Sequence, residues 1–285
     1  MHLVSRALVN QQEAITRNER RIRALHEAVA DSNSLALNQW VHFHAVALEY
    51  RPDLIIEIGR GFGNSTTAFV EAVHGTGGWG RVFSVCYSNS WDQDTLPKLR
   101  RFLERSWFRP LDAPTLDIRD VDFARVVGDA RRVLLLWDAH GYEVADCILS
   151  RLMPLLAGRE HFVAIHDISD GRYCGNALDY GNLPFWRGQE GGWASQTARL
   201  RIGWIDTVVE QALPLLDFLT RNRLELGSAD HIVKTEVTRD TALIERLNAG
   251  YPSGFFSDVN HWAYFTLNDS PPPYTFPRYW PTLRP

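Results

Sequence analysis

The spacing of apolar residues changes between the first 50 residues and the rest of the chain. Residues 3–29 are polar and helix-friendly, with apolar positions at loosely helical spacing. Residues 34–50 carry a fuller apolar face behind Ser34, which is a suitable N-cap, and Pro52 ends that pattern. The pattern predicts an N-terminal helical extension over residues 1–50, whose helices would offer a surface for homo-oligomer formation.

From residue 51 onward, short apolar runs alternate with helical segments. Five runs have the length of strands: 53–59, 81–87, 115–119, 132–141 and 161–169. Helical patterns fill most of the gaps between them: 64–74, 94–106, a short connection near 120–130, and 143–158. Two more strand signals follow, over 224–236 and 261–267. This order predicts an α/β domain over 51–270, built on a doubly wound, mostly parallel seven-stranded sheet.

Residues 171–204 interrupt the alternation. They are rich in glycine, arginine and aromatic residues and show no period. A long aperiodic segment with many aromatic residues is typical of a functional lid, so we expect a lid inserted after the fifth strand. A helix is expected over 205–222. The proline-rich residues 271–285 predict an extended C-terminal arm that lies on the surface.

Composition and charge narrow the class of protein. The chain has 285 residues, of which 45% are apolar, so it has ample material for a core. Its net charge of −4 argues against a dedicated nucleic-acid binder. Three widely spaced cysteines form no zinc-ligand pattern, no signal peptide is evident, and no run approaches the roughly 18 apolar residues of a membrane span. We therefore expect a cytoplasmic protein without nucleic-acid or membrane partners.

A glycine-rich turn follows the first predicted strand. Glu57 is followed by Gly59, Gly61 and Gly63, and the next helix begins at Asn64 and Ser65. Alternating glycines let a backbone approach a ligand closely, and a helix N-terminus presents free N–H groups to it. In open α/β sheets, ligands bind at this edge. A tight turn without a ligand is the alternative.

With this E-x-G-x-G-x-G spacing, the chain resembles the class I S-adenosylmethionine-dependent methyltransferases, which have a Rossmann-like fold. The resemblance covers residues 53–169, and its later motifs, Asp138-x-His140-x-Tyr142 and His166-Asp167, look like those of the macrocin-type O-methyltransferases. It implies that Glu57, Gly59, Gly61, Gly63, Asn64, Ser65 and Asp138 bind the cofactor S-adenosyl-L-methionine.

The chain departs from this family at the end of the second strand. The family carries a carboxylate there that binds both ribose hydroxyls, whereas this chain has Cys86, followed by Tyr87. A thiol cannot hold a diol in a bidentate manner, so Ser88, Asn89 or Asp92 would have to substitute from the loop. For the adenine, the resemblance points to Asp117 or Asp120, and solvated surface carboxylates are the alternative.

Acidic and histidine side chains end the fourth and fifth predicted strands. Asp138 and His140 end one, and His166 and Asp167 end the other. If these strands are neighbours, the four side chains converge, and Asp138, His166 and Asp167 are a plausible site for Mg²⁺ or another divalent metal. His140, with Asp138 and His166 beside it, would then deprotonate an acceptor hydroxyl. The alternative is a capping role for Asp138 and a buried, hydrogen-bonded His166. His42 and His44 are expected to pack.

Ten tryptophans are many for a chain of this length. Trp186 and Trp193 fall in the expected lid, where aromatic rings close over ligands at low entropic cost. With Tyr142, they are the residues we expect to contact the substrate.

Together these features predict a methyltransferase that O-methylates a hydroxyl of a small molecule, a sugar or a natural product, with possible metal assistance. Two alternatives stay open. One is a non-catalytic binding or assembly protein on the same fold, for which Cys86 is the best support. The other is an iron-dependent hydroxylase-like enzyme, in which the acidic and histidine residues would bind iron.

Overall fold

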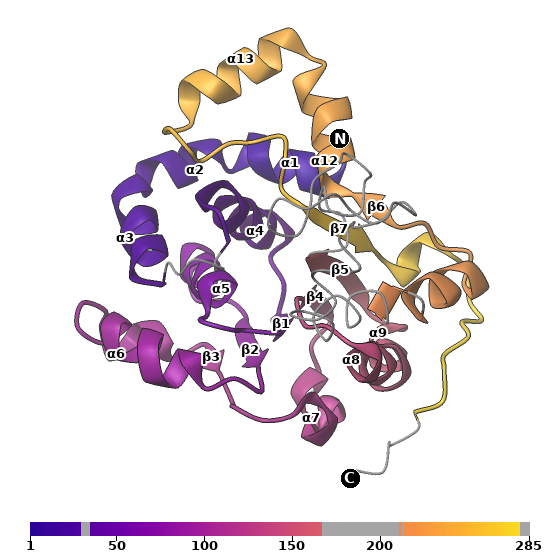
Figure 1. Ribbon diagram of the computed structural model, residues 1–285. Coiled ribbons are helices and arrows are strands. Elements are labelled where there is room, and N and C mark those ends of the chain that lie inside the picture. The colour runs from indigo at the N-terminus through magenta and orange to yellow at the C-terminus, as the bar shows by residue number, and fades with distance from the viewer. Residues whose placement is uncertain (30–34, 167–210, 213, 280–285) are drawn as a thin grey trace, which may run out of the picture.

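The computed structural model describes residues 1–29, 35–166, 211–212 and 214–279. A seven-stranded sheet with the order β3-β2-β1-β4-β5-β7-β6 forms its centre (Figure 1). The strands are β1 (Leu54–Ile58), β2 (Arg81–Val85), β3 (Leu111–Asp112), β4 (Arg132–Trp137), β5 (Glu160–His166), β6 (Gly227–Ser228) and β7 (Trp262–Phe265). β1 to β5 run parallel, and β7 is antiparallel to β5 and β6. The predicted doubly wound, mostly parallel seven-stranded sheet is confirmed.

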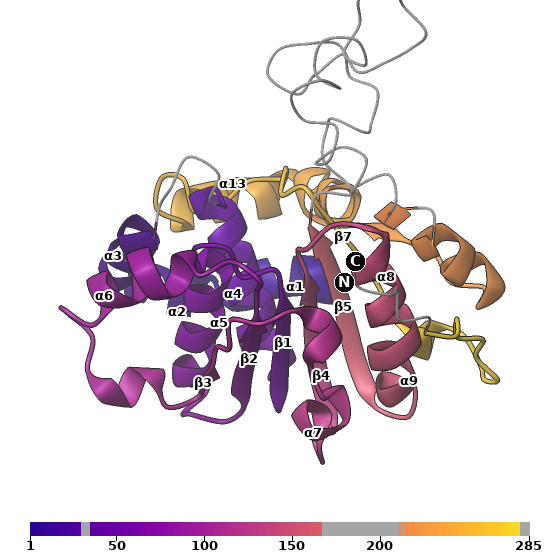
Figure 2. The ribbon, with the colours of Figure 1, turned by 60° about the horizontal axis from the view of Figure 1, so that its bottom comes forward.

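Helices cover both faces of this sheet, which explains why β1 is buried at all five positions. Figure 2 shows α4 (Leu37–Tyr50) and α5 (Asn64–Gly75) on one side, with α8 (Tyr142–Cys147) and α9 (Met153–Leu156) on the other. Side chains of β1 alternate between the two faces, so the two layers have separate apolar clusters. β1 pairs with β2 on one side and β4 on the other, which brings the ends of these three strands together.

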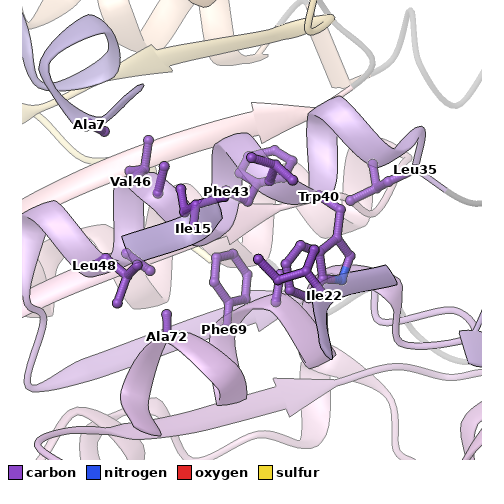
Figure 3. Packing of buried hydrophobic residues seen from close by; sticks show 14 of the residues in the cluster. Ala7, Ile15, Ile22, Leu35, Trp40, Phe43, Val46, Leu48, Phe69 and Ala72 are labelled. Atoms are coloured by element: carbon purple, nitrogen blue, oxygen red, sulfur yellow. The ribbon is translucent and has the colours of Figure 1, made fainter. Parts of the chain in front are cut away.

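The N-terminal residues form three short helices, α1 (Leu3–Asn10), α2 (Gln12–Arg17) and α3 (Glu19–Val29). Their apolar residues pack into the layer of α4 and α5, as Ile15 and Ile22 do beside Phe43 and Phe69 (Figure 3). The expected helices are present. The apolar positions that motivated an oligomerisation surface are buried in the chain's own core, and homo-oligomer formation stays a prediction.

Three predicted elements are wrong in extent. The third strand is β3 at Leu111–Asp112 rather than 115–119, where only Thr115 forms an isolated bridge, to Cys86. In place of one helix over 94–106, α6 covers Leu96–Leu99 between a π turn and a 3-10 turn.

The third wrong element is the strand predicted over 224–236, which is reduced to β6. The hydroxyl of Ser228 accepts a hydrogen bond from the His231 N–H and starts helix α12 (Ala229–Val233). Beyond it, α13 (Thr241–Gly250) was not predicted.

The C-terminal arm is extended over its described residues 271–279, and it packs Tyr274, Phe276 and Tyr279 against the layer of α8 and α9. Of the helix expected over 205–222, residues 211–212 and 214–221 are described and are helical. The expected lid at 171–204 lies outside the described residues, as does Ser34. None of the described helices is long and apolar enough to cross a membrane.

Candidate active site

The three glycines after β1 adopt backbone conformations that L-residues rarely reach. Their φ angles are +102° at Gly59, +52° at Gly61 and +88° at Gly63. A Cβ at Gly59 would lie 2.0 Å from the Asp138 carbonyl oxygen, and one at Gly63 would lie 2.1 Å from the Trp91 ring. A Cβ at Gly61 would meet no atom within 4 Å. Gly59 and Gly63 are therefore required by close packing, whereas Gly61 faces open space.

Glu57 stabilises this turn from inside the protein. It is fully buried, and its carboxylate accepts hydrogen bonds from the hydroxyls of Ser65, Thr66 and Ser84. Burial raises the pKa of the Glu57 carboxyl, although the three hydroxyl donors oppose that rise. The side chains of Glu57 and Ser65 are hydrogen-bonded to each other inside the protein, and their predicted contacts with the cofactor stay a prediction.

Asn64 is the first residue of α5 and is nearly buried, with 6% of its surface exposed. Its side-chain Oδ1 and Nδ2 are buried, and no hydrogen-bond partner for them is found within the described chain. Unpaired buried amide atoms are costly, and here they lie at a helix N-terminus next to the glycine turn. This position suits a polar ligand group, and the predicted contact of Asn64 with the cofactor stays a prediction.

A cavity of 270 Å³ opens at the carboxyl ends of β1, β2 and β4. Its lining combines the backbone of Gly59, apolar side chains and a few polar groups: Ile58, Val85, Cys86, Tyr87, Leu116, Asp117, Ile118, Arg119, Ala139, His140, Glu143 and Val144. This mixture is typical of small-molecule sites. The cavity lies at the edge of the sheet where the sequence placed the ligand.

Asp117 and Glu143 are the acidic residues in the lining of this cavity, and Asp117 is the one that the sequence singled out. Its carboxylate accepts hydrogen bonds from the Arg119 backbone and guanidinium, so it is held in place at the cavity wall. Asp120 is exposed and does not line the cavity, whereas Asp117 does, and the predicted role of either residue toward the adenine stays a prediction. Ser88 also lies outside the lining, and its hydroxyl is 2.6 Å from that of Ser90.

Cys86 and Tyr87 occupy the end of β2 and line the cavity. Cys86 is partly exposed and is one of two free cysteines among the described residues. Asp92, considered as a substitute for the missing carboxylate, accepts a hydrogen bond from Thr115 instead. In the described structure, the thiol of Cys86 therefore occupies the end of β2, and Asp92 does not line the cavity.

Asp138 and His166 meet across the ends of β4 and β5, as the strand order predicted. The His166 Nδ1 lies 3.1 Å from the Asp138 Oδ1. The other ring nitrogen, Nε2, lies 3.4 Å from the Nε2 of Gln39 on α4. Both nitrogens of His166 thus face protein partners, so a metal could bind His166 only by displacing one of them. The sequence predicted the helix that carries Gln39 but did not identify Gln39 itself as a residue of the site.

His140 has a comparable amide partner. Its Nδ1 lies 3.2 Å from the Oε1 of Gln211, a fully buried residue that was likewise not identified. The Nε2 of Gln211 has no hydrogen-bond partner within the described chain. His140 lines the 270 Å³ cavity, whereas Asp138 and His166 lie beside it.

Asp167 lies outside the described residues. Within the described ranges, no three His, Cys, Asp or Glu side chains form a group that would hold a metal ion. The predicted metal site at Asp138, His166 and Asp167 stays a prediction.

Of the three predicted substrate residues, the structure describes Tyr142. Tyr142 lines a separate groove of 580 Å³ between α8, the helical residues 214–221 and the C-terminal arm, and its predicted contact with the substrate stays a prediction. Trp186 and Trp193 lie outside the described residues. Trp137 is fully buried and donates a hydrogen bond to the Ala139 carbonyl. His42 and His44 are buried and hydrogen-bonded to backbone carbonyls, as expected for packed residues.

No protein-family model matches the chain, and no curated protein matches it. Solved structures do. One is the SAH-bound methyltransferase PaMTH1 of Podospora anserina, with 11% identity and a TM-score of 0.46 over 87% of this chain and 94% of that chain. Another is the O-methyltransferase TomG of Streptomyces achromogenes in complex with SAM, with 14% identity and a TM-score of 0.43 over 72% and 80%. At such identities, the similarity concerns the fold only.

The parallel strands β1 to β5 and the antiparallel β7 define a doubly wound, Rossmann-like α/β fold. Within that fold, the residues present suit S-adenosylmethionine at two places. The open backbone at Gly61 and the unpaired amide of Asn64 suit its amino acid end, and the cavity beside Asp117 suits its adenine. At the end of β2, the thiol of Cys86 suits the ribose less well.

Proposed function

We propose that this protein is an S-adenosylmethionine-dependent methyltransferase that acts on a hydroxyl of a small molecule. The observation that carries the proposal is the geometry after β1. Gly61 leaves the backbone open near a 270 Å³ cavity, and the 12-residue helix α5 begins three residues later at Asn64, whose side-chain amide has no hydrogen-bond partner within the described residues. A backbone that is open to a polar ligand at this edge of the sheet is what a nucleoside-type cofactor needs.

Different residues of the chain would bind different parts of this cofactor. Asn64 and the N–H groups of the turn would bind the carboxylate and amino groups. Leu116 and Ile118 would pack against the adenine, and the Asp117 carboxylate would accept a hydrogen bond from its exocyclic amine. The cofactor, when bound, supplies a methyl group activated on a sulfonium.

His140 is the residue we propose as the general base. It lines the cavity, and the Gln211 Oε1 faces its Nδ1, which orients the ring. An imidazole held in this way can remove the proton of an acceptor hydroxyl near neutral pH. Asp138 precedes His140 by two residues, and the hydrogen bond between Asp138 and His166 orients the Asp138 carboxylate. Assistance by a divalent metal at Asp138 and Asp167, and contacts of Trp186 and Trp193 with the acceptor, are further parts of this proposal.

Calorimetry with S-adenosylhomocysteine tests the cofactor. We expect a saturable binding isotherm for the wild type and loss of binding for Gly61→Val, whose branched side chain fills the open approach. Gly77→Val is a matched control, because Gly77 also has a positive φ and open space around it, at a loop far from the site in sequence. No binding by the wild type, or equal binding by Gly61→Val, would refute the proposal.

A binding or assembly protein on the same fold is the second candidate, because Cys86 replaces the expected ribose ligand. The two are separated by a transfer assay with a panel of hydroxyl acceptors and labelled S-adenosylmethionine. Binding without any transfer would favour the second candidate. Metal analysis of the purified protein addresses the iron-dependent hydroxylase hypothesis.

A further inference from the structure

Gln39 connects the N-terminal helical extension to the ends of β4 and β5. It lies on the first turn of α4 and is 8% exposed, and its amide reaches three groups from different parts of the chain. The Oε1 atom lies 2.8 Å from the Ala36 backbone nitrogen. The Nε2 atom lies 2.9 Å from the Asn260 carbonyl oxygen and 3.4 Å from the His166 Nε2.

These contacts determine which way the amide is turned. The Ala36 N–H can only donate, so the atom of Gln39 that faces it must be the oxygen. The Asn260 carbonyl can only accept, so the atom that faces it must be the NH₂ group. Both ends of the amide therefore agree on one orientation, and this orientation presents an N–H donor to His166.

The amide orientation in turn determines the proton position on His166. A ring nitrogen that faces an N–H donor must supply a lone pair, so Nε2 is the unprotonated nitrogen. On the other side, the Asp138 carboxylate accepts, so Nδ1 carries the proton and donates across 3.1 Å. The hydrogen-bonded series Gln39–His166–Asp138 thus has one consistent set of donors and acceptors.

We propose that Gln39 is a positioning residue that holds His166 in its Nδ1–H tautomer and so fixes the carboxylate of Asp138 at the edge of the sheet. Asp138 lies at the end of β4 next to the cavity, and its backbone N–H is bonded to Ile58. This bond holds the backbone of Asp138, so only the orientation of its carboxylate depends on a further contact. The hydrogen bond from His166 is that contact. The role in methyl transfer rests on the proposed function, whereas the tautomer does not.

Nitrogen-15 NMR of the histidine side chains tests the tautomer directly, with His166 assigned by comparison with His166→Gln. In the wild type we expect a pyrrole-type resonance at Nδ1 and a hydrogen-bonded, pyridine-type resonance at Nε2. Gln39→Leu removes the donor, and the Nε2 resonance should shift. Gln39→Glu keeps the length and the acceptor for Ala36, so it serves as a second variant without the donor if Gln39→Leu folds poorly.

Asn38→Ala is the matched control. Asn38 is the neighbouring residue on α4, and its amide donates to the Val259 carbonyl and lies 3.3 Å from the Asn260 Oδ1, within the same loop, without contacting His166. Its spectrum at His166 should match the wild type. A proton on Nε2 in the wild type, or an unchanged Nε2 resonance in both Gln39 variants, would overturn the inference.

The kinetic consequence is measured separately. Loss of the restraint on Asp138 should lower kcat about tenfold or more while KM for S-adenosylmethionine stays within about twofold. Equal kcat in wild type and Gln39→Leu would overturn the positioning role. If no acceptor is methylated at all, the proposed function and this role fail together, whereas the NMR result still decides the tautomer.

Discussion

The backbone carbonyl oxygen of Asp138 lies where a side chain on Gly59 would have to begin. A Cβ at residue 59 would be 2.0 Å from that oxygen, and the Asp138 N–H donates to the Ile58 carbonyl across 2.8 Å. The glycine turn and the end of β4 are therefore packed backbone against backbone. This contact joins the predicted cofactor turn to the strand that carries Asp138 and His140.

Gly59→Ala should disrupt this contact. With a positive φ and a backbone clash at the same residue, we expect a loss of about 3 kcal/mol or more in the free energy of unfolding. Gly61→Ala, at φ +52° with open space, should cost only about 1 kcal/mol. Urea unfolding of both variants measures the difference, and equal losses would contradict the packing described above.

Glu57→Ala should destabilise the turn strongly, because it leaves the hydroxyls of Ser65, Thr66 and Ser84 without their shared acceptor. We expect a loss of about 3–5 kcal/mol. Glu57→Gln keeps an oxygen acceptor and should lose about half as much. Denaturant unfolding measures both, and amide hydrogen exchange in α5 should increase more in Glu57→Ala. A loss under about 1 kcal/mol for Glu57→Ala would contradict the anchoring role.

Cys86→Asp should improve the binding of S-adenosylhomocysteine. A carboxylate at the end of β2 would accept two charge-assisted hydrogen bonds from the ribose hydroxyls, which corresponds to an affinity gain of about tenfold. Cys86→Ser is the size-matched control and should bind like the wild type. Calorimetry with adenosine and 2′,3′-dideoxyadenosine locates the effect. If Cys86→Asp improves the binding of both ligands equally, the carboxylate does not act through the ribose hydroxyls.

Stability should fall as the pH drops below neutrality, and His42 is one cause. Burial lowers the pKa of His42 from 6.5 to about 4, and its Nε2 lies 3.1 Å from the Val4 carbonyl oxygen. Between pH 6.5 and pH 4, the unfolded chain takes up a proton at this residue that the folded chain does not. The contribution of His42 to the free energy of unfolding is therefore complete above pH 6.5. As the pH falls toward 4, about 3 kcal/mol of this free energy is lost.

Urea unfolding between pH 8 and pH 4.5 measures this dependence. His42→Gln keeps a donor for Val4 without a titrating ring, so its stability should fall less over the same range. Burial lowers the pKa of His44 as well, so part of the dependence should persist in the variant. A His42→Gln profile parallel to the wild type would show that His42 does not contribute.

The strands that matter most for the site were predictable from local patterns. β1, β4 and β5 are mostly apolar runs, and such runs signal strands that are buried on both faces. The glycine turn after β1 was also visible, because its backbone conformations depend on residue types at neighbouring positions. The weaker strand at 115–119 was wrong because its few apolar residues serve the cavity wall and a 3-10 turn instead.

The sequence by itself determined the class of sheet, the edge of the sheet at which the 270 Å³ cavity opens and the meeting of Asp138 with His166, all of which follow from strand order and local spacing. Only the tertiary structure decided that Asp117 and not Asp120 faces the cavity, that Tyr142 faces away from it, and that Gln39 reaches His166. Gln39 and His166 lie 127 positions apart. Their contact depends on how α4 packs against the sheet, and no local pattern records where two distant side chains point once their backbones are packed.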